Sequence, residues 1–236
     1  MRKTEQKFTS LKRVLIGGSA APRAMMREFQ EKYGVEGLQG WGMTEMSPIG
    51  TVSMIRPKDA DLQLDRQFDI KAKQGRAVFG VEMKIVNDDG QALPRDGKSF
   101  GELLVRGPAI ISGYYENPEA SAKAFDSEGW FRTGDVSKID PEGYMEIVDR
   151  TKDVIKSGGE WISSIDLENE AVGHPEIAEA AVIAVHHPKW DERPLLVVVR
   201  EPDSQLDKQG VIDYLSQRVA KWWLPDDVVF VDELPH

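Results

Sequence analysis

The sequence contains no cysteine among its 236 residues. Disulfide bonds, thiolate metal sites and a cysteine nucleophile are therefore excluded, and a reducing, cytoplasmic setting is expected. Long apolar runs are missing as well, because stretches such as residues 180–185 and 195–199 are far shorter than the roughly 20 residues of a membrane helix. The polar start MRKTEQKFTS lacks the apolar core of a signal peptide. The sequence thus predicts no transmembrane segment.

Positive charge is scarce: 30 lysines and arginines against 40 aspartates and glutamates give a formal net charge of −10. Nucleic acids and anionic membranes bind surfaces with a positive field, so neither is expected as the main partner. Any phosphate-bearing ligand must instead be held by local cations. A hydrophobic content of 40% is ordinary for a soluble globular protein, and the length allows one large or two modest domains.

Histidine chemistry is also poorly supported. The four histidines, His174, His186, His187 and His236, show no metal-ligand spacing and no partner nucleophile. His186 and His187 precede Pro188 in a predicted loop. The sequence therefore gives no support for a Ser-His-Asp catalytic triad.

The most informative segment, residues 149–164, reads DRTKDVIKSGGEWISS. It places three cations before a glycine pair and an aromatic ring: Arg150, Lys152, Lys156, Gly158, Gly159 and Trp161. The cations supply charge for a polyanion, and paired glycines let the backbone reorient or approach a ligand closely. A lysine-rich hairpin on a solvated surface is the alternative, and the segment alone does not decide between them.

A second motif, GWGMTE, occupies residues 40–45. Trp41 could pack against adenine, Thr44 could hydrogen-bond a phosphate, and Glu45 could bind magnesium, because hard cations that bridge phosphates take carboxylate oxygens. The alternative is a strand that runs into a loop, with Trp41 packed in the core.

Two weaker motifs are WFRTGD, residues 130–135, and the Gly17-Gly18-Ser19 turn. Asp135 follows a glycine at the start of a predicted β hairpin, and an aspartate can accept hydrogen bonds from two ribose hydroxyls at once. The alternative is a plain turn-forming aspartate. The glycine turn joins a predicted strand to a predicted helix, and its backbone N–H groups could face an anion.

The first part of the chain predicts a β-turn-α unit. Residues 14–16 predict a buried strand, residues 22–33 a helix, and residues from 38 onward a second short strand. A buried strand in an α/β domain needs flanking strands, so this part is expected to belong to something longer. We assign residues 1–74 to the C-terminal part of a large α/β subdomain.

Residues 75–149 predict a small antiparallel, barrel-like β subdomain. Short strands over residues 81–86, 101–105, 136–139 and 144–148 alternate with turn sequences at 88–90 and 140–143. The basic segment that follows lies at the junction with a third folding unit.

Residues 150–236 predict a small α+β domain. Ser163 and Asp166 form a capping box for a helix that should end near Gly173. A strand pair over residues 180–185 and 195–199, a helix over 207–223 ended by Pro225, and a strand over 228–231 follow. The fold class is therefore α/β and α+β multidomain.

Six blocks, taken in order, resemble the adenylate-forming superfamily of acyl-CoA synthetases, adenylation domains and luciferases. The blocks are GGSAAP, QGWGMTE, GELLVRGP, GYYENPEAS, WFRTGD and DRTKDVIKSGGEWISSIDLENE. The resemblance covers residues 11–235. Within the superfamily, DRTKD followed by IKSGGEWISS, with HHPKWDERPL further on, is most similar to bacterial medium- to long-chain fatty acyl-CoA synthetases.

The resemblance implies a two-step reaction that uses ATP, Mg²⁺ and coenzyme A. A fatty acid carboxylate attacks the α-phosphate of ATP to give an acyl adenylate and pyrophosphate, and the coenzyme A thiol then displaces AMP. The absence of cysteine agrees, because the thiol comes with the cofactor. The substrates are small molecules, and a homodimer is one assembly open to the intact enzyme.

The same resemblance implies roles for individual residues. The adenine wall is formed by four of them: Gly18, Gln39, Gly40 and Trp41. Thr44 binds phosphate and Glu45 holds magnesium, and with Lys152 these two carry the catalytic role.

Asp135 and Arg150 are implied to hold the ribose, and Lys156 to lie near the nucleotide. In the family the small C-terminal domain is mobile and rotates between the two half-reactions, and Lys152 corresponds to the pivot. After rotation the segment from Lys156 through Gly158 and Gly159 to Trp161 faces the pantetheine tunnel.

Two expected family elements are missing from the sequence: an upstream Ser/Thr/Gly-rich phosphate loop with its lysine, and a C-terminal catalytic lysine beyond His236. Their absence removes the main electrostatic stabilisation at the α-phosphate. We therefore expect the C-terminal part of a fatty acyl-CoA synthetase, inactive by itself. Two alternatives stay open: an adenylation domain that loads a carrier-protein phosphopantetheine, and a non-catalytic remnant that binds nucleotide or a partner. Acyl chain length cannot be read, since the acyl pocket lies upstream.

Overall fold

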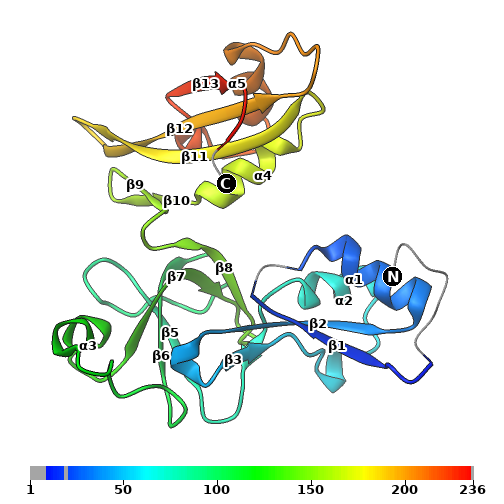
Figure 1. Cartoon of the computed structure of the whole chain (residues 1–236), viewed down its shortest axis with the longest axis vertical. Coiled ribbons are helices and arrows are strands. Elements are labelled where there is room, and N and C mark those ends of the chain that lie inside the picture. The colour runs from blue at the N-terminus through cyan, green and yellow to red at the C-terminus, as the bar shows by residue number, and fades with distance from the viewer. Residues whose placement is uncertain (1–8, 19–20, 235–236) are drawn as a thin grey trace. The chain divides into compact units, whose positions relative to one another are not determined.

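The computed structural model describes residues 9–18 and 21–234. Ser19, which ends the predicted glycine turn, and His236 lie outside the described residues. The chain forms two compact units, Met1–Ile147 and Val148–His236 (Figure 1). Among the described residues, every helix is too short or too polar to cross a bilayer.

The first unit begins with a four-stranded sheet of order β1-β2-β3-β4. Its elements follow one another as β1 (Arg13–Ile16), α1 (Arg23–Tyr33), β2 (Glu36–Gly42), η1 (Thr44–Met46), β3 (Ile49–Val52), η2 (Pro57–Asp59), α2 (Leu64–Lys71) and β4 (Arg76–Ala77). Strands β1 and β2 are parallel, whereas β3 is antiparallel to both β2 and β4. The predicted β-turn-α unit is present, and α1 begins within one residue of its predicted start.

The expectation that residues 14–16 form a buried strand is half wrong. The strand exists, but the Leu15 side chain is 47% exposed and the flanking residues are half-buried. Within the described chain β1 pairs with β2 alone, so it lies at the edge of the sheet and no strand covers its outer side. An apolar sequence run therefore identified the strand and overestimated its burial.

The second sheet of the first unit has the order β5-β6-β7-β8. Its elements are β5 (Glu82–Val86), β6 (Phe100–Arg106), α3 (Pro118–Ala124), β7 (Phe131–Ile139) and β8 (Met145–Arg150). β6 is antiparallel to both β5 and β7, which confirms that this part of the chain forms an antiparallel sheet. The predicted turn before β8 is present too, because the Asp140 N–H donates to the Tyr144 carbonyl at 3.0 Å.

The main core of the first unit draws on both sheets. Its buried members are Trp41, Met46, Val81, Met83, Ile85, Leu103, Val105, Phe131, Ile139 and Met145. Trp41 comes from the first sheet, and Phe131 begins the strand that carries the TGD tripeptide. The packing of this core therefore brings the second and third sequence motifs together.

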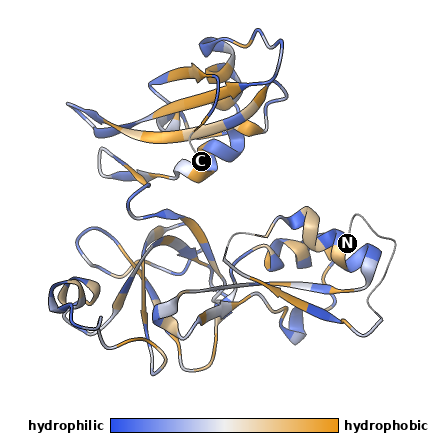
Figure 2. Cartoon of the chain, in the orientation of Figure 1, coloured by the Kyte–Doolittle hydropathy of each residue, from blue (hydrophilic) through white to orange (hydrophobic). Residues whose placement is uncertain are grey.

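The second unit is a sheet with helices packed on it. Its elements are β9 (Ile155–Ser157), β10 (Glu160–Ile162), α4 (Ser164–Val172), β11 (Ile177–His187), β12 (Asp191–Arg200), α5 (Lys208–Ser216), η3 (Lys221–Trp223) and β13 (Asp227–Val231). β12 pairs antiparallel with β11 and parallel with β13. Apolar residues follow β11 and β12 (Figure 2), and buried ones such as Leu196 and Val198 pack with Leu167 of α4 and Leu215 of α5.

Local signals located α4 correctly. The Ser163 hydroxyl accepts a hydrogen bond from the Asp166 N–H at 3.0 Å, and the helix is capped by Gly173, as predicted. The predicted loop at His186 and His187 is wrong, because both residues end β11 and pair with Glu192 and Asp191 of β12. The hairpin turn is therefore confined to residues 188–190.

The predicted helix over residues 207–223 is too long. α5 ends at Ser216, and Lys221–Trp223 forms a separate 3-10 turn. Ala220 is extended, with φ −61° and ψ 142°, which breaks the helix. Val211 and Leu215 are buried from α5, while Val219 and Trp223 pack against the same core from the following turns. The spacing of the apolar residues therefore indicated which side chains contact the core, but these residues do not all belong to one continuous helix.

Candidate functional site

A cavity of about 280 Å³ opens in the first unit where β1 and β2 end. Its lining combines the glycine turn after β1 with the GWGMTE segment: Leu15, Gly17, Gly18, Gly40, Trp41, Gly42, Met43, Thr44, Pro48 and Ile49. Four predicted site residues therefore share one cavity, namely Gly18, Gly40, Trp41 and Thr44. Ligands of open α/β sheets bind at this end of parallel strands.

The parallel register explains why the two glycine segments meet. Ile16 lies opposite Gln39, so the next residues, Gly17 and Gly40, follow side by side. A Cβ atom built at Gly17 would lie 3.3 Å from the Gly40 oxygen, closer than most side chains tolerate. Gly18 has φ +87°, a conformation that favours glycine. Two glycine segments without side chains thus form part of the cavity lining.

Trp41 lines this cavity and is also a core residue. The residue is 9% exposed, and Gly50 lets the ring approach, because a Cβ atom there would lie 2.7 Å from Cζ3 of Trp41. Gly50 is the extra residue of a bulge where β3 pairs with β2. The indole N–H donates to Oδ2 of Asp135 at 2.8 Å. Trp41 is therefore packed in the core, as the alternative interpretation predicts. Its indole N–H also forms a hydrogen bond with the Asp135 carboxylate.

The sequence predicts that Asp135 starts a β hairpin, and this prediction is wrong. The residue lies within β7, and Thr133, Gly134 and Asp135 form a bulge between the pairs Leu104–Arg132 and Glu102–Val136. Gly134 has φ +72°, which the bulge requires. The Thr133 hydroxyl donates to the Leu103 carbonyl at 2.8 Å and accepts from the Asp135 N–H at 3.1 Å. The bulge fixes the direction of the Asp135 carboxylate toward Trp41.

Gln39 is not part of the cavity lining. The residue is 1% exposed, and its Oε1 accepts a hydrogen bond from the Ala21 N–H at 3.3 Å. Its own N–H donates to the Ser53 hydroxyl at 2.7 Å. The side chain therefore holds the segment that leads into α1.

Glu45 follows Thr44 in the 3-10 turn η1. Its Oε1 accepts a hydrogen bond from the Tyr114 hydroxyl at 3.1 Å, and its carbonyl accepts from the Ile111 N–H at 2.9 Å. Burial, together with the Glu45 carboxylate, raises the pKa of Tyr114 above its ordinary value, so the phenol stays a donor. The described part of the chain holds no group of three His, Cys, Asp or Glu side chains placed for a metal ion. A cation bound at Glu45 would therefore need further oxygen atoms from a bound phosphate group or from water.

The second unit has a cavity of about 560 Å³. Its lining is Ser157, Gly158, Glu160, Trp190, Arg193, Trp222 and Asp226. Trp190 and Trp222 are 43% and 44% exposed, an unusual state for rings of this size. Both rings therefore offer apolar surface to a ligand.

The predicted Gly158-Gly159 turn borders this cavity. It joins β9 to β10 as a two-residue hairpin with φ +61° and +87°. The Gly158 N–H donates to the Trp190 carbonyl at 2.7 Å. Lys156 and Trp161 face each other across the hairpin, with Nζ 4.8 Å from the ring centroid. Four of the predicted site residues thus belong to one hairpin, namely Lys156, Gly158, Gly159 and Trp161.

Arg193 belongs to the block HHPKWDERPL, but the sequence alone predicts no role for it. Its guanidinium donates to Asp226, to the carbonyls of Trp222 and Leu224, all at 2.8 Å, and to the Ser157 hydroxyl at 3.2 Å. Arg193 therefore holds the Trp222 segment against β9. The signal was present in the motif, but the partners lie about thirty residues away in the chain and could not be identified from it.

Arg150 ends β8, and Lys152 follows in an exposed turn. The N–H groups of Asp153 and Val154 donate to the Arg150 carbonyl at 3.0 and 2.9 Å. Asp149, which the sequence analysis did not single out, is 1% exposed and accepts from the Ser164 N–H at 2.6 Å. Asp149 thus ties the end of β8 to the start of α4.

Comparison with known proteins places these features in a family. Residues 1–115 match the AMP-binding enzyme family, and residues 166–236 match the AMP-binding enzyme C-terminal domain. The chain belongs to the AMP-binding enzyme family. The resemblance to adenylate-forming enzymes is therefore confirmed, as is the mixed α/β and α+β fold class.

Two fatty-acid ligases of the AMP-binding enzyme family are similar to the chain. It is 51% identical over 229 residues to a medium-chain-fatty-acid–CoA ligase of Ectopseudomonas oleovorans, covering 97% of this chain and 41% of that protein. It is 45% identical over 235 residues to a long-chain-fatty-acid–CoA ligase of Thermus thermophilus, covering 100% and 43%. The chain thus spans less than half the length of these relatives.

Solved structures of the family share the fold. ATP-bound MatB from Rhodopseudomonas palustris has a TM-score of 0.75 at 33% identity, covering 94% of this chain and 42% of that one. The o-succinylbenzoate CoA synthetase MenE from Bacillus subtilis, in complex with its acyl-adenylate intermediate, has a TM-score of 0.77 at 29% identity, covering 99% and 45%.

Proposed function

We propose that this chain forms part of an AMP-forming acid–CoA ligase that activates a fatty acid. The carboxylate attacks the α-phosphorus of ATP and displaces pyrophosphate, giving an acyl adenylate. The coenzyme A thiol then attacks the acyl carbon and displaces AMP. The identity of 51% and 45% to two fatty-acid–CoA ligases supports this reaction. The observation that carries it is the Trp41–Asp135 hydrogen bond, which joins two motifs beside one cavity.

The nucleotide is proposed to bind at the first cavity. MatB and MenE, which share the fold, are bound to ATP and an acyl adenylate. In this chain the Gly18 and Gly40 segments offer a bare backbone rim to adenine, and Trp41 forms its wall. Asp135 accepts from the ribose hydroxyls while the indole N–H of Trp41 fixes the carboxylate. Gln39 acts indirectly, by holding the start of α1.

Thr44 and Glu45 are proposed to meet the phosphates. The Thr44 hydroxyl is exposed at the cavity and donates to a phosphate oxygen. Glu45 fits Mg²⁺, because this ion takes one or two carboxylates, phosphate oxygens and water in place of a full protein cage. The Tyr114 hydroxyl orients that carboxylate through Oε1. When bound, the ion would neutralise charge on the phosphates.

Coenzyme A is proposed to use the second cavity. The Gly158-Gly159 turn leaves its edge free of side chains, and the Trp190 and Trp222 rings suit flat or apolar parts of the cofactor. Arg193 keeps Trp222 in place through the Trp222 carbonyl. The curated relatives are named as CoA ligases, which favours free coenzyme A over a carrier protein as the acceptor.

The domain roles are part of the same proposal. We assign residues 1–74 to the large α/β subdomain, 75–149 to the β subdomain and 150–236 to a mobile C-terminal domain. Rotation about Lys152 would bring Lys156 to the nucleotide in one half-reaction and the Gly158-Gly159 turn to the pantetheine arm in the other, while Arg150, which precedes the pivot, holds the ribose. The lack of cysteine supports a cytoplasmic enzyme, and a homodimer stays a prediction.

Fatty-acid-dependent exchange of pyrophosphate into ATP tests the first half-reaction. The complete polypeptide that contains this chain is expected to catalyse the exchange with at least one fatty acid of medium or long chain. Omission of the fatty acid is the control. Exchange with no fatty acid of any length would contradict the proposed function.

A further inference from the structure

A separate cavity of about 500 Å³ lies in the first unit beside the edge strand β5. Its wall includes Arg76 of β4, Glu82 and Lys84 of β5, Arg95 from the following loop, and Trp130. It shares no lining residue with the cavity at the GWGMTE segment. No step of the proposed reaction uses these side chains.

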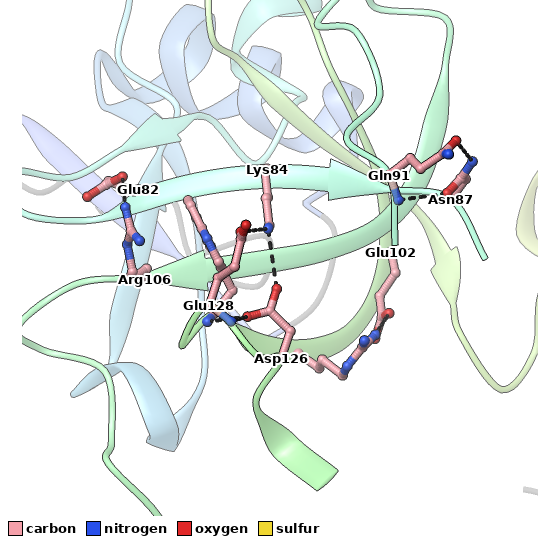
Figure 3. A network of polar contacts seen from close by, with 10 residues as sticks. Glu82, Lys84, Asn87, Gln91, Glu102, Arg106, Asp126 and Glu128 are labelled. Atoms are coloured by element: carbon pink, nitrogen blue, oxygen red, sulfur yellow. Dashed lines mark hydrogen bonds and ion pairs between the residues drawn. The ribbon is translucent and has the colours of Figure 1, made fainter. Parts of the chain in front are cut away.

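Two of the charged groups in this wall are already neutralised. Nζ of Lys84 lies 3.0 Å from Glu128 and 3.3 Å from Asp126, as Figure 3 shows. The Arg106 guanidinium lies 2.9 Å from the Glu82 carboxylate. The Lys84 cluster thus carries one excess negative charge and the Arg106–Glu82 pair carries none, so neither offers positive charge to a ligand.

Arg76 and Arg95 differ from the other charged groups of the wall. Neither forms an ion pair with any residue in the ranges 9–18 and 21–234, although the whole chain carries a formal net charge of −10. Nη2 of Arg95 donates to the Met83 carbonyl at 2.5 Å, which anchors the side chain. The remaining N–H groups of a guanidinium stay available to a ligand when one is used in this way.

Arg76 lies beside an aromatic ring. Its guanidinium carbon lies 6.0 Å from the centroid of Tyr144. Tyr144 is 2% exposed, and its hydroxyl donates to the Met54 carbonyl at 2.7 Å, so the ring cannot move aside easily. The Met83 carbonyl therefore anchors Arg95, and Arg76 lies beside a ring that is itself fixed; both arginines are exposed and can reach a ligand.

We propose that Arg76 and Arg95 form a binding site for a compact dianionic oxyanion, either a phosphate group or a dicarboxylate. The planar guanidinium donates two parallel hydrogen bonds to such a group, and two guanidinium groups without an ion-pair partner among the described residues suit a dianion. The volume lies in the range of small-molecule sites. Trp130, with Lys84 and Arg106 against its ring at 4.7 and 4.4 Å, gives the site a rigid wall.

Calorimetric titration of the full chain with inorganic phosphate, and separately with succinate, tests the site at low ionic strength, where screening is weak. At least one of the two is expected to bind at a single site. Arg76→Gln and Arg95→Gln should each weaken that binding by at least about tenfold. Arg66→Gln is the matched control, because this arginine lies on α2 with its side chain 76% exposed. It should bind as the native chain does.

Two further arms separate this site from the nucleotide cavity and from misfolding. Saturation with AMP should leave oxyanion binding unchanged, and the glutamine variants should bind AMP as the native chain does. Arg76→Lys and Arg95→Lys keep the charge and lose the paired donors, so intermediate affinity is expected from folded protein. Phosphate binding alone or succinate binding alone identifies the source of the dianion.

Three results would overturn the site: no binding of either oxyanion, native affinity in both glutamine variants, or loss of oxyanion binding when AMP is added. A chain that binds oxyanion and not AMP would contradict the nucleotide proposal and leave this one standing.

Discussion

At the scale of single residues, charged side chains in this chain derive their properties from partners distant in sequence. Lys71 of α2 is 3% exposed, and its Nζ lies 3.2 Å from the Glu36 carboxylate and 3.0 Å from the Gln30 side chain. A buried lysine needs such a partner, because an unpaired charge away from water is costly. The ion pair joins α2 to β2, and the hydrogen bond to Gln30 joins α2 to α1.

The Glu36–Lys71 pair predicts a pH dependence of stability. Burial acts to raise the pKa of Glu36, but hydrogen bonds and charge from Arg13 and Lys71 outweigh it and hold the pKa below its ordinary value. The folded state then binds fewer protons at Glu36 than the unfolded state does. The stabilisation is present above the unfolded pKa and is lost as pH falls through the folded pKa.

Urea unfolding of native chain and Glu36→Gln across the acid range measures this dependence. The native chain should be the more stable at neutral pH, and the difference should shrink as the solution becomes more acidic. Glu119→Gln is the control, because the Glu119 side chain is 80% exposed on α3. A stability difference for Glu36→Gln that does not change with pH would contradict the argument.

Residue-scale features explain part of what the sequence could not predict. The sequence predicts Asp135 at the start of a β hairpin because Gly134 precedes it, yet the glycine serves a bulge whose position depends on pairing with β6. Arg76 and Arg95 are nineteen positions apart and share a cavity through the fold alone. Such placements require tertiary register, which local sequence does not encode.

At the scale of elements, the β9–β10 hairpin shows how closely backbone conformation and packing are linked. Gly158 and Gly159 both have positive φ, at +61° and +87°. A Cβ atom at Gly158 would lie 2.8 Å from Cε3 of Trp190, whereas one at Gly159 would have no atom within 4 Å. Both glycines therefore need a positive φ, but only Gly158 is packed closely against another side chain.

Alanine substitution at these two positions should separate the two effects. Gly159→Ala is expected to destabilise the second unit by about 1 kcal/mol, the cost of a left-handed non-glycine residue. Gly158→Ala should cost about 2 to 3 kcal/mol, because the new methyl group also displaces the Trp190 ring. Chemical unfolding followed by tryptophan fluorescence measures both. Equal effects, or a larger one at Gly159, would refute the contact with Trp190.

Elements with strong local signals were predicted well. The serine cap of α4 and the glycine pair between β9 and β10 are set by chemistry within a few residues. The errors came where packing or pairing overrode local pattern: His186 and His187 joined β11 by pairing with β12, and the apolar spacing after Leu215 came from turns that pack on the core.

At the scale of the whole molecule, the chain consists of two compact units that each carry one part of the proposed site. Gly18, Gly40, Trp41, Thr44 and Asp135 lie in the first. Arg150, Lys152, Lys156, Gly158, Gly159 and Trp161 lie in the second. A reaction with two half-steps can use this division, because one unit can hold the nucleotide while the other changes position.

The proposed function depends most on the nucleotide cavity in the first unit. Calorimetric titration of the chain with AMP tests it most directly, with Asp135→Asn as the variant and Asp89→Asn, in an exposed turn of the same unit, as the control. AMP should bind at one site, Asp135→Asn should weaken it by at least about tenfold, and the control should not change it. No AMP binding by the native chain, or equal binding by Asp135→Asn, would contradict the assignment.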